Sequence, residues 1–269
     1  MRRMSIHPNA YYNYRKNRKD GYRQELASRL EKIGRKFHDL DGTRGYRQVC
    51  DQLKKDGLIM SYPTCHKYLN KLLGLKSIQR KRKPVYEHGD YHQTVENILN
   101  QNFKAERKNE KWCMDFTYVA LKDGTFRYNC TIIDLFDRSV IASENSRQIN
   151  TELAIRTVLK GIESQDEIDT SRLMIHTDQG CQFTSNAFQF FCNNRKIRQS
   201  MSRAGYPYDN APMERYFNTL KTELLNVHEY SKEKDLYKAI NDFAYIWYNQ
   251  NRTHTYNNHR TPYEVRFAA

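Results

Sequence analysis

The sequence lacks any apolar run approaching the roughly 18 residues that a membrane span needs, so it predicts no transmembrane helix. The amino terminus carries charge but lacks the apolar segment of a secretory signal. The six cysteines include no Cys-x-x-Cys pair. Several of them fall inside apolar strand patterns, which favours reduced core thiols over disulfides or a zinc site. Together these absences predict a cytoplasmic protein.

Acidic residues are fewer than basic ones, and the formal net charge is +14. Residues 1–110 hold 25 Lys and Arg against 12 Asp and Glu, whereas residues 111–269 hold 20 against 19. A basic excess confined to one region is the electrostatic footprint of nucleic-acid binding. A basic membrane-surface segment is the alternative, but no lipidation motif or strongly amphipathic basic helix supports it.

The amino-terminal third shows helical periodicity. Apolar residues recur at intervals of three and four across 17–40, and helices follow over 46–56 and 63–73. Two short helices joined near a glycine, here Gly57, are the layout of a helix-turn-helix. The alternative is a generic small helical bundle with a solvated basic face.

In the helix-turn-helix interpretation, residues 63–73 are the recognition helix. Its predicted inner face includes Leu69, Leu72 and Leu73. Its exposed face would present three DNA-binding candidates: Lys67, Asn70 and Lys71. A basic run beyond this helix could track a phosphate backbone, and its candidates are Arg80, Lys81, Arg82 and Lys83. A short helix is expected over 92–99.

The second half of the chain alternates between strand and helix patterns. Trp112 to Val119 alternates with period two, Asp123-Gly124 predicts a hairpin, and returning strands are expected over 126–133 and 139–142. The expected order after these strands is helix, strand, helix, strand, helix, at 151–163, 172–177, 184–194, 197–201 and 211–226. Three antiparallel strands followed by alternating helices and strands predict an α/β fold with a mixed, ribonuclease-H-like sheet.

Four regions follow from these patterns. Residues 1–83 are expected to form the all-α, helix-turn-helix-like DNA-binding region, and 84–110 a basic and polar linker. The catalytic core is expected over 111–230. A carboxy-terminal helix and tail, 231–269, would pack on that core.

Three carboxylates lie in or beside these expected elements. Asp115 lies in the middle of an apolar strand, Asp178 follows a buried strand, and Glu214 begins a helix. Burying an unpaired carboxylate is costly, and metal coordination offsets that cost. Carboxylate oxygens are hard ligands that suit Mg²⁺ or Mn²⁺ rather than zinc. The alternative for any one of these acids is a loop residue or a partner of a helix dipole.

The sequence around these carboxylates resembles the Asp-Asp-Glu transposases of insertion sequences, whose catalytic part is similar to retroviral integrases. The matching segments are Trp112–Tyr118, His176–Ser185, Tyr208–Glu214, Leu220–Glu223 and Trp247–His254, and 35 residues separate Asp178 from Glu214, the spacing of this group. Gly45-Tyr46-Arg47 and Gly74-Leu75 fit the helix-turn-helix part. The resemblance covers nearly the whole chain.

The resemblance implies that Asp115, Asp178 and Glu214 are the catalytic residues and the ligands of two Mg²⁺ or Mn²⁺ ions. It implies that Lys221 holds the DNA end. The implied reaction is cleavage at transposon ends followed by joining of the 3′ ends to target DNA. For His176 a structural and a catalytic role remain equally open.

The resemblance also implies partners. These are double-stranded DNA, comprising terminal inverted repeats and target, and further copies of the chain assembled on DNA. The implied location is the cytoplasm, in association with the nucleoid. In this family the catalytic part is often made with an upstream reading frame, so this chain is expected to be a second-frame product that works with an upstream helix-turn-helix segment.

Other classes of protein fit less well. A tyrosine recombinase needs a His-x-x-Arg box, and the sequence has none. A structure-selective nuclease with a ribonuclease-H-like fold would cut DNA without joining it. A DNA-binding regulator without catalysis would need only residues 1–83, yet all three carboxylates are present.

Overall fold

The computed structural model describes residues 7–16, 18–77 and 95–268. Its contacts divide the chain into two compact units, 1–79 and 80–269, which are treated separately below. Within the described part of the chain, no helix combines the length and apolar character that crossing a membrane requires.

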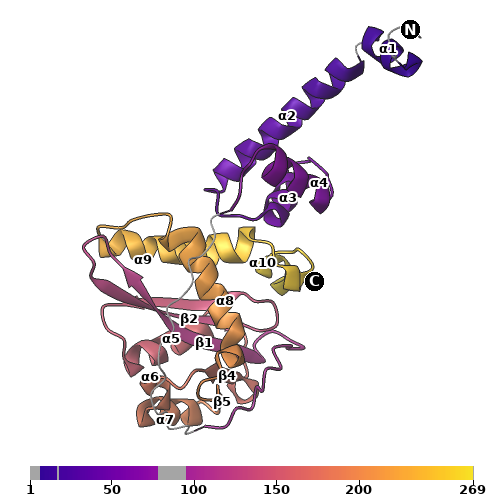
Figure 1. The fold of residues 1–269 in the computed structure, drawn as a ribbon. Helices are drawn as coiled ribbons and strands as arrows, with labels where there is room; N and C mark the ends of the chain where they lie inside the picture. The colour runs from indigo at the N-terminus through magenta and orange to yellow at the C-terminus, as the bar shows by residue number, and fades with distance from the viewer. Residues whose placement is uncertain (1–6, 17, 78–94, 269) are drawn as a thin grey trace. The chain divides into compact units, whose positions relative to one another are not determined.

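The described residues of the amino-terminal unit form helices joined by turns (Figure 1). Its elements are α1 (Pro8–Arg15), α2 (Arg18–Asp39), α3 (Tyr46–Lys55), α4 (Tyr62–His66) and the π-helical η2 (Lys67–Leu72). The Ser61 hydroxyl accepts a hydrogen bond from the Thr64 backbone N–H and so caps α4. Apolar side chains of α2 to η2 form a small buried core, which includes Ile33, Phe37, Val49, Leu53, Cys65 and Leu69.

The predicted single helix over 63–73 is wrong in one respect, because the chain widens from an α-helical to a π-helical turn at Lys67. A π-helical turn holds more residues than an α-helical one, so it rotates the later side chains away from their expected face. Leu69 is buried as expected, but Leu72 is 51% exposed. The short helix expected over 92–99 is also absent from its described part, residues 95–99, whereas 92–94 lie outside the described residues.

The second unit is built on a five-stranded sheet of order β3-β2-β1-β4-β5. Its strands are β1 (Lys111–Ala120), β2 (Phe126–Asp134), β3 (Val140–Ser146), β4 (Met174–Thr177) and β5 (Arg198–Met201). The first three pair antiparallel, while β4 pairs parallel with both β1 and β5. The predicted ribonuclease-H-like mixed sheet is therefore confirmed.

Helices cover both faces of this sheet. On one face, α5 (Thr151–Glu163), α6 (Cys181–Thr184) and α7 (Asn186–Asn194) pack over a core that contains Trp112, Met114 and Phe188. On the other face, α8 (Ala211–Leu220) packs over Cys113 and Ile133. Because side chains alternate along β1, its odd-numbered residues face α8. Asp115 therefore belongs to the α8 face.

The carboxy-terminal elements close the α8 side of the sheet. The 3₁₀ turns η3 (Thr170–Arg172) and η4 (Pro207–Asn210) connect earlier elements, and α8 runs into the π-helical η5 (Lys221–Leu225). There follow α9 (Glu233–Asn241), η6 (Asp242–Asn251), η7 (Thr255–Asn257) and α10 (Pro262–Arg266). The Asn249 amide bonds both backbone groups of Val140, at 2.8 and 2.9 Å, and so fastens η6 to β3.

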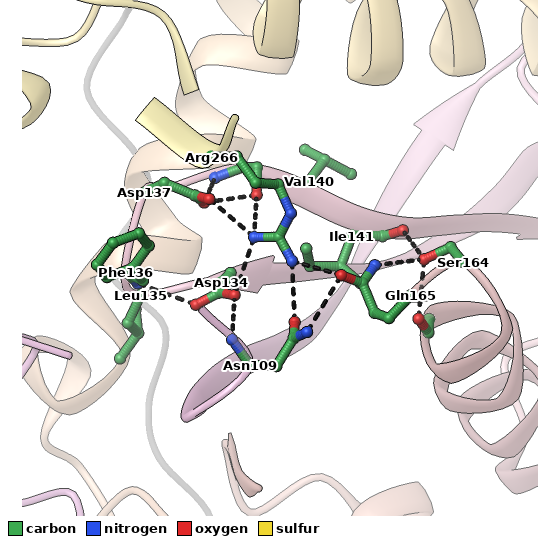
Figure 2. A network of polar contacts seen from close by, with 12 residues as sticks. Asn109, Asp134, Leu135, Phe136, Asp137, Val140, Ile141, Ser164, Gln165 and Arg266 are labelled. Carbon is green, nitrogen blue, oxygen red and sulfur yellow. Dashed lines mark hydrogen bonds and ion pairs between the residues drawn. The ribbon is translucent and has the colours of Figure 1, made fainter. Parts of the chain in front are cut away.

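A buried ionic network holds α10 on the sheet (Figure 2). Arg266 Nη1 lies 3.1 Å from Asp134 Oδ2 and 2.8 Å from Asp137 Oδ2, and its Nη2 donates to Asn109 Oδ1 at 2.9 Å. Both aspartates are completely buried. Burial and the charge of Asp137 raise the pKa of Asp134 to about 6, although Arg266 acts in the opposite direction.

We expect Arg266→Met to lower the free energy of unfolding by about 3–5 kcal/mol at pH 7.5, since it leaves two buried carboxylates without their cation. The loss should shrink at pH 5. There Asp134 takes up a proton, because its folded pKa of about 6 lies above that pH, and the repulsion between the two carboxylates disappears. Urea unfolding at the two pH values measures both effects.

The matched control is Arg172→Met, whose partner Asp169 lies 3.8 Å away in an exposed pair. An exposed pair contributes little, so this variant should unfold like the wild type at either pH. An equal loss for Arg266→Met at both pH values would show that the aspartates are not the reason for its effect.

Candidate active site

The parallel pairing of β1 with β4 sets two carboxylates side by side. Cys113 lies opposite His176 in the register of the two strands. Asp115 and Asp178 each follow these residues by two positions. They therefore lie level with one another, at the point where β4 ends. Both line one pocket of about 380 Å³, together with Glu214.

A close backbone turn positions Asp178. The Gly180 backbone N–H donates to Asp178 Oδ1 at 2.9 Å. A Cβ atom at position 180 would lie only 3.0 Å from that same oxygen and 3.2 Å from Gln182 Oε1. A larger residue at position 180 would therefore require the Asp178 carboxylate to shift by a few tenths of an ångström.

Glu214 comes from the first turn of α8, where it is exposed. Met213, Phe217 and Leu220 are buried against the sheet and fix the rotation of that helix. Lys221 follows Glu214 by seven residues, two helical turns, and its charge acts on Asp115. The structure thus brings Asp115, Asp178, Glu214 and Lys221 into one neighbourhood.

The two aspartates in this pocket have raised pKa values. Burial, followed by the charge of Asp178, raises the pKa of Asp115 well above its ordinary value, while the Phe116 N–H and Lys221 oppose the shift. Burial raises the pKa of Asp178 as well. Perturbed pKa values of this kind, in a pocket, are typical of functional sites.

The donor set fits a hard divalent cation. All three acidic groups offer carboxylate oxygens, which Mg²⁺ and Mn²⁺ prefer. A dication would remove the repulsion that raises the pKa of Asp115. Across residues 7–16, 18–77 and 95–268, no group of three or more His, Cys, Asp or Glu side chains is placed so that it could hold a metal ion.

His176 is hydrogen-bonded on both sides of its ring. Its Nδ1 lies 2.9 Å from Ser200 Oγ and its Nε2 lies 3.1 Å from Ser202 Oγ, so both ring nitrogens are engaged. Burial lowers the pKa of His176 to about 4, which keeps the ring neutral at physiological pH. Of the two roles left open by the sequence, hydrogen bonding is the one that these contacts favour.

Asp209 anchors the turn that leads into α8. The completely buried carboxylate accepts hydrogen bonds from Asn97 Nδ2 at 2.8 Å and Gln101 Nε2 at 2.7 Å. It also accepts from the backbone N–H and the guanidinium of Arg203, at 3.0–3.1 Å. The Arg203 hydrogen bonds contribute most to lowering the pKa of Asp209 below its ordinary value. These contacts fix the backbone immediately before Asn210.

Sequence reasoning did not single out several pocket residues. The lining also includes Gln179, Arg203, Tyr206 and Asn210. Gln179 lies in the matching segment His176–Ser185 and Asn210 in the matching segment Tyr208–Glu214. Their position beside the two carboxylate motifs was the one available signal.

The DNA-binding candidates of the amino-terminal unit lie in η2. Lys67 and Lys71 are exposed, whereas Asn70 is partly buried and its Oδ1 has no partner among the described residues. Arg80, Lys81, Arg82 and Lys83 lie outside the described residues.

Comparison with known families gives two matches. Residues 105–207 match an integrase core domain family, and residues 195–262 match a second family with the same description. Together the two matches span the segments that carry Asp115, Asp178 and Glu214.

Solved structures with a similar chain include the simian T-cell lymphotropic virus intasome in complex with PP2A regulatory subunit B56 gamma. That match has a TM-score of 0.49 and 19% identity, and covers 84% of this chain and 72% of the other. The catalytic core domain of HTLV-2 integrase in complex with magnesium matches with a TM-score of 0.46 and 22% identity, over 60% of this chain and 99% of the other.

Curated relatives match along nearly the whole chain. The transposase for insertion sequence element IS904 of Lactococcus lactis is 31% identical over 93% of this chain and 96% of its own length. The putative transposase InsK for element IS150 of Escherichia coli is 30% identical over 95% and 88%. With this identity along both chains and an integrase core over the carboxylate pocket, the protein belongs to the insertion-sequence transposases with an integrase core domain.

Proposed function

We propose that this transposase cuts DNA at transposon ends and joins the freed 3′ ends to target DNA at the Asp115, Asp178 and Glu214 pocket. The observation that carries this proposal is the convergence of the three carboxylates on one pocket from a strand, a strand end and a helix start. The partly buried, adjacent Asp115 and Asp178 support it, because a bound cation would stabilise both side chains as carboxylates.

Asp115, Asp178 and Glu214 would hold two Mg²⁺ or Mn²⁺ ions. When bound, such ions activate an attacking oxygen and stabilise the leaving oxygen of a phosphodiester. Water is the nucleophile for cutting and the freed 3′ hydroxyl is the nucleophile for joining. Neutral His176 keeps Ser200 and Ser202 in place, and Lys221 offers a positive charge to the phosphate of the DNA end.

We further propose that the amino-terminal unit binds the transposon end through its basic residues. Lys67 and Lys71 are exposed on η2, and the basic run at 80–83 follows. Phosphate contacts of this kind fix the position of DNA on a protein, while base contacts provide specificity. The active assembly would contain several copies of the chain on DNA, together with any upstream-frame segment.

Asp178→Asn should abolish both cutting and joining, because the variant loses one carboxylate of the cation site. Its metal-free form should be as stable as the wild type or slightly more so, since the change removes repulsion with Asp115. Mg²⁺ should raise the melting temperature of the wild type more than that of the variant. Gel assays of cleaved and joined ends, with thermal melts in EDTA and in Mg²⁺, test this prediction.

The matched control is Asp235→Asn, which removes an exposed carboxylate in the first turn of α9. This variant should retain both activities and the full effect of Mg²⁺ on melting. Near-normal joining by Asp178→Asn would disprove the metal-ligand assignment, and cutting without joining by the wild type would identify a nuclease instead.

A fragment of residues 1–90 should bind duplex DNA with an affinity that falls steeply with salt, with log K dropping by about 0.9 per phosphate contact per log unit of salt. Changing Lys67 and Lys71 to Ala together should make that slope shallower by roughly 2. Fluorescence anisotropy of a labelled end duplex over a salt series measures the slope.

The control for this experiment is the pair Lys54→Ala and Lys55→Ala, which removes two exposed charges from the end of α3. It should change the slope less than the Lys67 and Lys71 double variant does. If both double variants change the slope equally, η2 has no special place in DNA binding and the generic basic bundle is the better description.

A further inference from the structure

The helix that carries Lys221 changes its winding at that residue. α8 ends at Leu220, and the Asn226 backbone N–H then donates to the Lys221 carbonyl, five residues back, at 2.8 Å. An α-helix bonds residues four apart, so the turn is wider here. Single π-helical turns are rare and are found frequently at functional sites. A wider turn also rotates the side chains on it, so the direction of Lys221 depends on what holds η5 in place.

Burial holds η5 less firmly than it holds α8. All five residues of η5 are described, and none of them is fully buried. Leu224 and Leu225 are only partly buried against neighbouring apolar clusters. In contrast, α8 buries the residues Met213, Tyr216, Phe217, Thr219 and Leu220. A further contact is therefore needed to fix the rotation of η5.

An ion pair provides such a contact. The Nε atom of Arg252 lies 3.2 Å from each carboxylate oxygen of Glu223, in the middle of η5. The Glu223 side chain is 7% exposed and the Arg252 side chain 18%, so water and salt screen the pair little. Residues two apart on a helix do not face the same side. Arg252 thus holds the turn from one side, while Lys221 extends from another.

Arg252 is itself fixed to the core. Its guanidinium carbon lies 5.8 Å from the centre of the Tyr248 ring. That ring packs edge-on against Tyr216 of α8, with the ring centres 4.9 Å apart. Both tyrosines are buried. These contacts lead back to α8, the helix that supplies the third carboxylate of the pocket.

The alternative explanation is that the pair only fastens the carboxy-terminal segment to the core. Other contacts already do so, because Asn249 bonds Val140 and the Arg266 network holds α10 on the sheet. A buried ion pair also often adds little net stability compared with apolar side chains of similar volume. A role in fixing the turn therefore explains the two charges better than attachment alone does.

We propose that Glu223 and Arg252 are positioning residues for Lys221. The ion pair holds η5 in its widened form and so directs the Lys221 ammonium group toward the carboxylate pocket, where its charge acts on Asp115. This inference rests on the proposed function, in which Lys221 offers that charge to the phosphate of the DNA end. Glu223 and Arg252 make no contact with DNA themselves and act through Lys221.

The test compares Lys221→Ala, Glu223→Gln and the double variant, all made in the full chain. The probe is a labelled duplex of the transposon end, read from the DNA that flanks the gene. Fluorescence anisotropy in EDTA over a salt series gives the affinity and its salt slope without cleavage. Cleavage of the same duplex in Mg²⁺ is measured separately.

We expect Lys221→Ala to make the salt slope shallower by about 0.9, the value for one lost phosphate contact. Glu223→Gln should do the same, and the double variant should show no further change. The direction is informative, because removing a carboxylate makes the protein more positive and would otherwise strengthen DNA binding. Cleavage should fall by up to roughly a hundredfold in each variant, the cost of a misplaced group.

The matched control is Glu233→Gln. Glu233 pairs with Arg127 at 2.6 Å and with Arg147 at 2.8 Å, and it does not line the carboxylate pocket. This variant removes the same charge but should not make the slope shallower. Combined with Lys221→Ala, it should give the slope of Lys221→Ala alone.

A second variant covers the case in which Glu223→Gln does not fold, because it leaves the Arg252 cation buried without its partner. Glu223→Gln combined with Arg252→Met removes both charges and avoids that cost. It should show the same shallower slope as Lys221→Ala, since η5 is no longer tied to Arg252.

Two results would overturn the positioning role. If Lys221→Ala makes the slope shallower but Glu223→Gln does not, the ion pair does not direct Lys221. If the double variant changes the slope more than Lys221→Ala does, Glu223 acts independently of Lys221. An unchanged slope for Lys221→Ala would contradict the proposed contact of Lys221 with the DNA end, and the positioning role with it. Absence of cleavage by the wild type would contradict the proposed function, while the salt slopes would still decide the positioning role.

Discussion

The pairing of β1 with β4 is the constraint on which the catalytic pocket depends. These two strands are far apart in sequence, and their parallel register alone sets Asp115 level with Asp178. A shift of one residue would turn every β1 side chain to the opposite face. Trp112 and Met114 would then leave the core under α5, so the burial of those two residues protects the register as well as the fold.

The third carboxylate of the pocket, Glu214, comes from α8 and not from a strand. Glu214 approaches from a helix whose rotation is fixed by buried Met213, Phe217 and Leu220. The start of that helix is fixed by Asp209, and its far end places Lys221 where its charge acts on Asp115. The carboxylates are therefore positioned by two separate sets of contacts. Strand pairing positions Asp115 and Asp178, and the packing of α8 positions Glu214.

Much of this arrangement could be predicted from the sequence, because hydrophobic periodicity is a local property. The alternation from Trp112 to Val119 and the helix over 151–163 correspond closely to β1 and α5. Local patterns could not predict the widened turn that exposes Leu72, because the choice between α- and π-helical turns depends on packing. Nor could they show that Asn210 lacks a capping bond, since that requires the position of every surrounding group.

The contacts of Asp209 limit where the catalytic core can be joined to a foreign DNA-binding unit. Asn97 and Gln101 lie more than 100 residues before Asp209 in sequence, yet they bond directly to its carboxylate. The Leu99 N–H, between them, donates to Ser200 Oγ at 3.0 Å. Residues 95–101 are thus part of the core although they precede its first strand. A chimera that joins a foreign DNA-binding unit to this core must place its junction before Val95, because a later junction would remove the partners that hold the active-site turn.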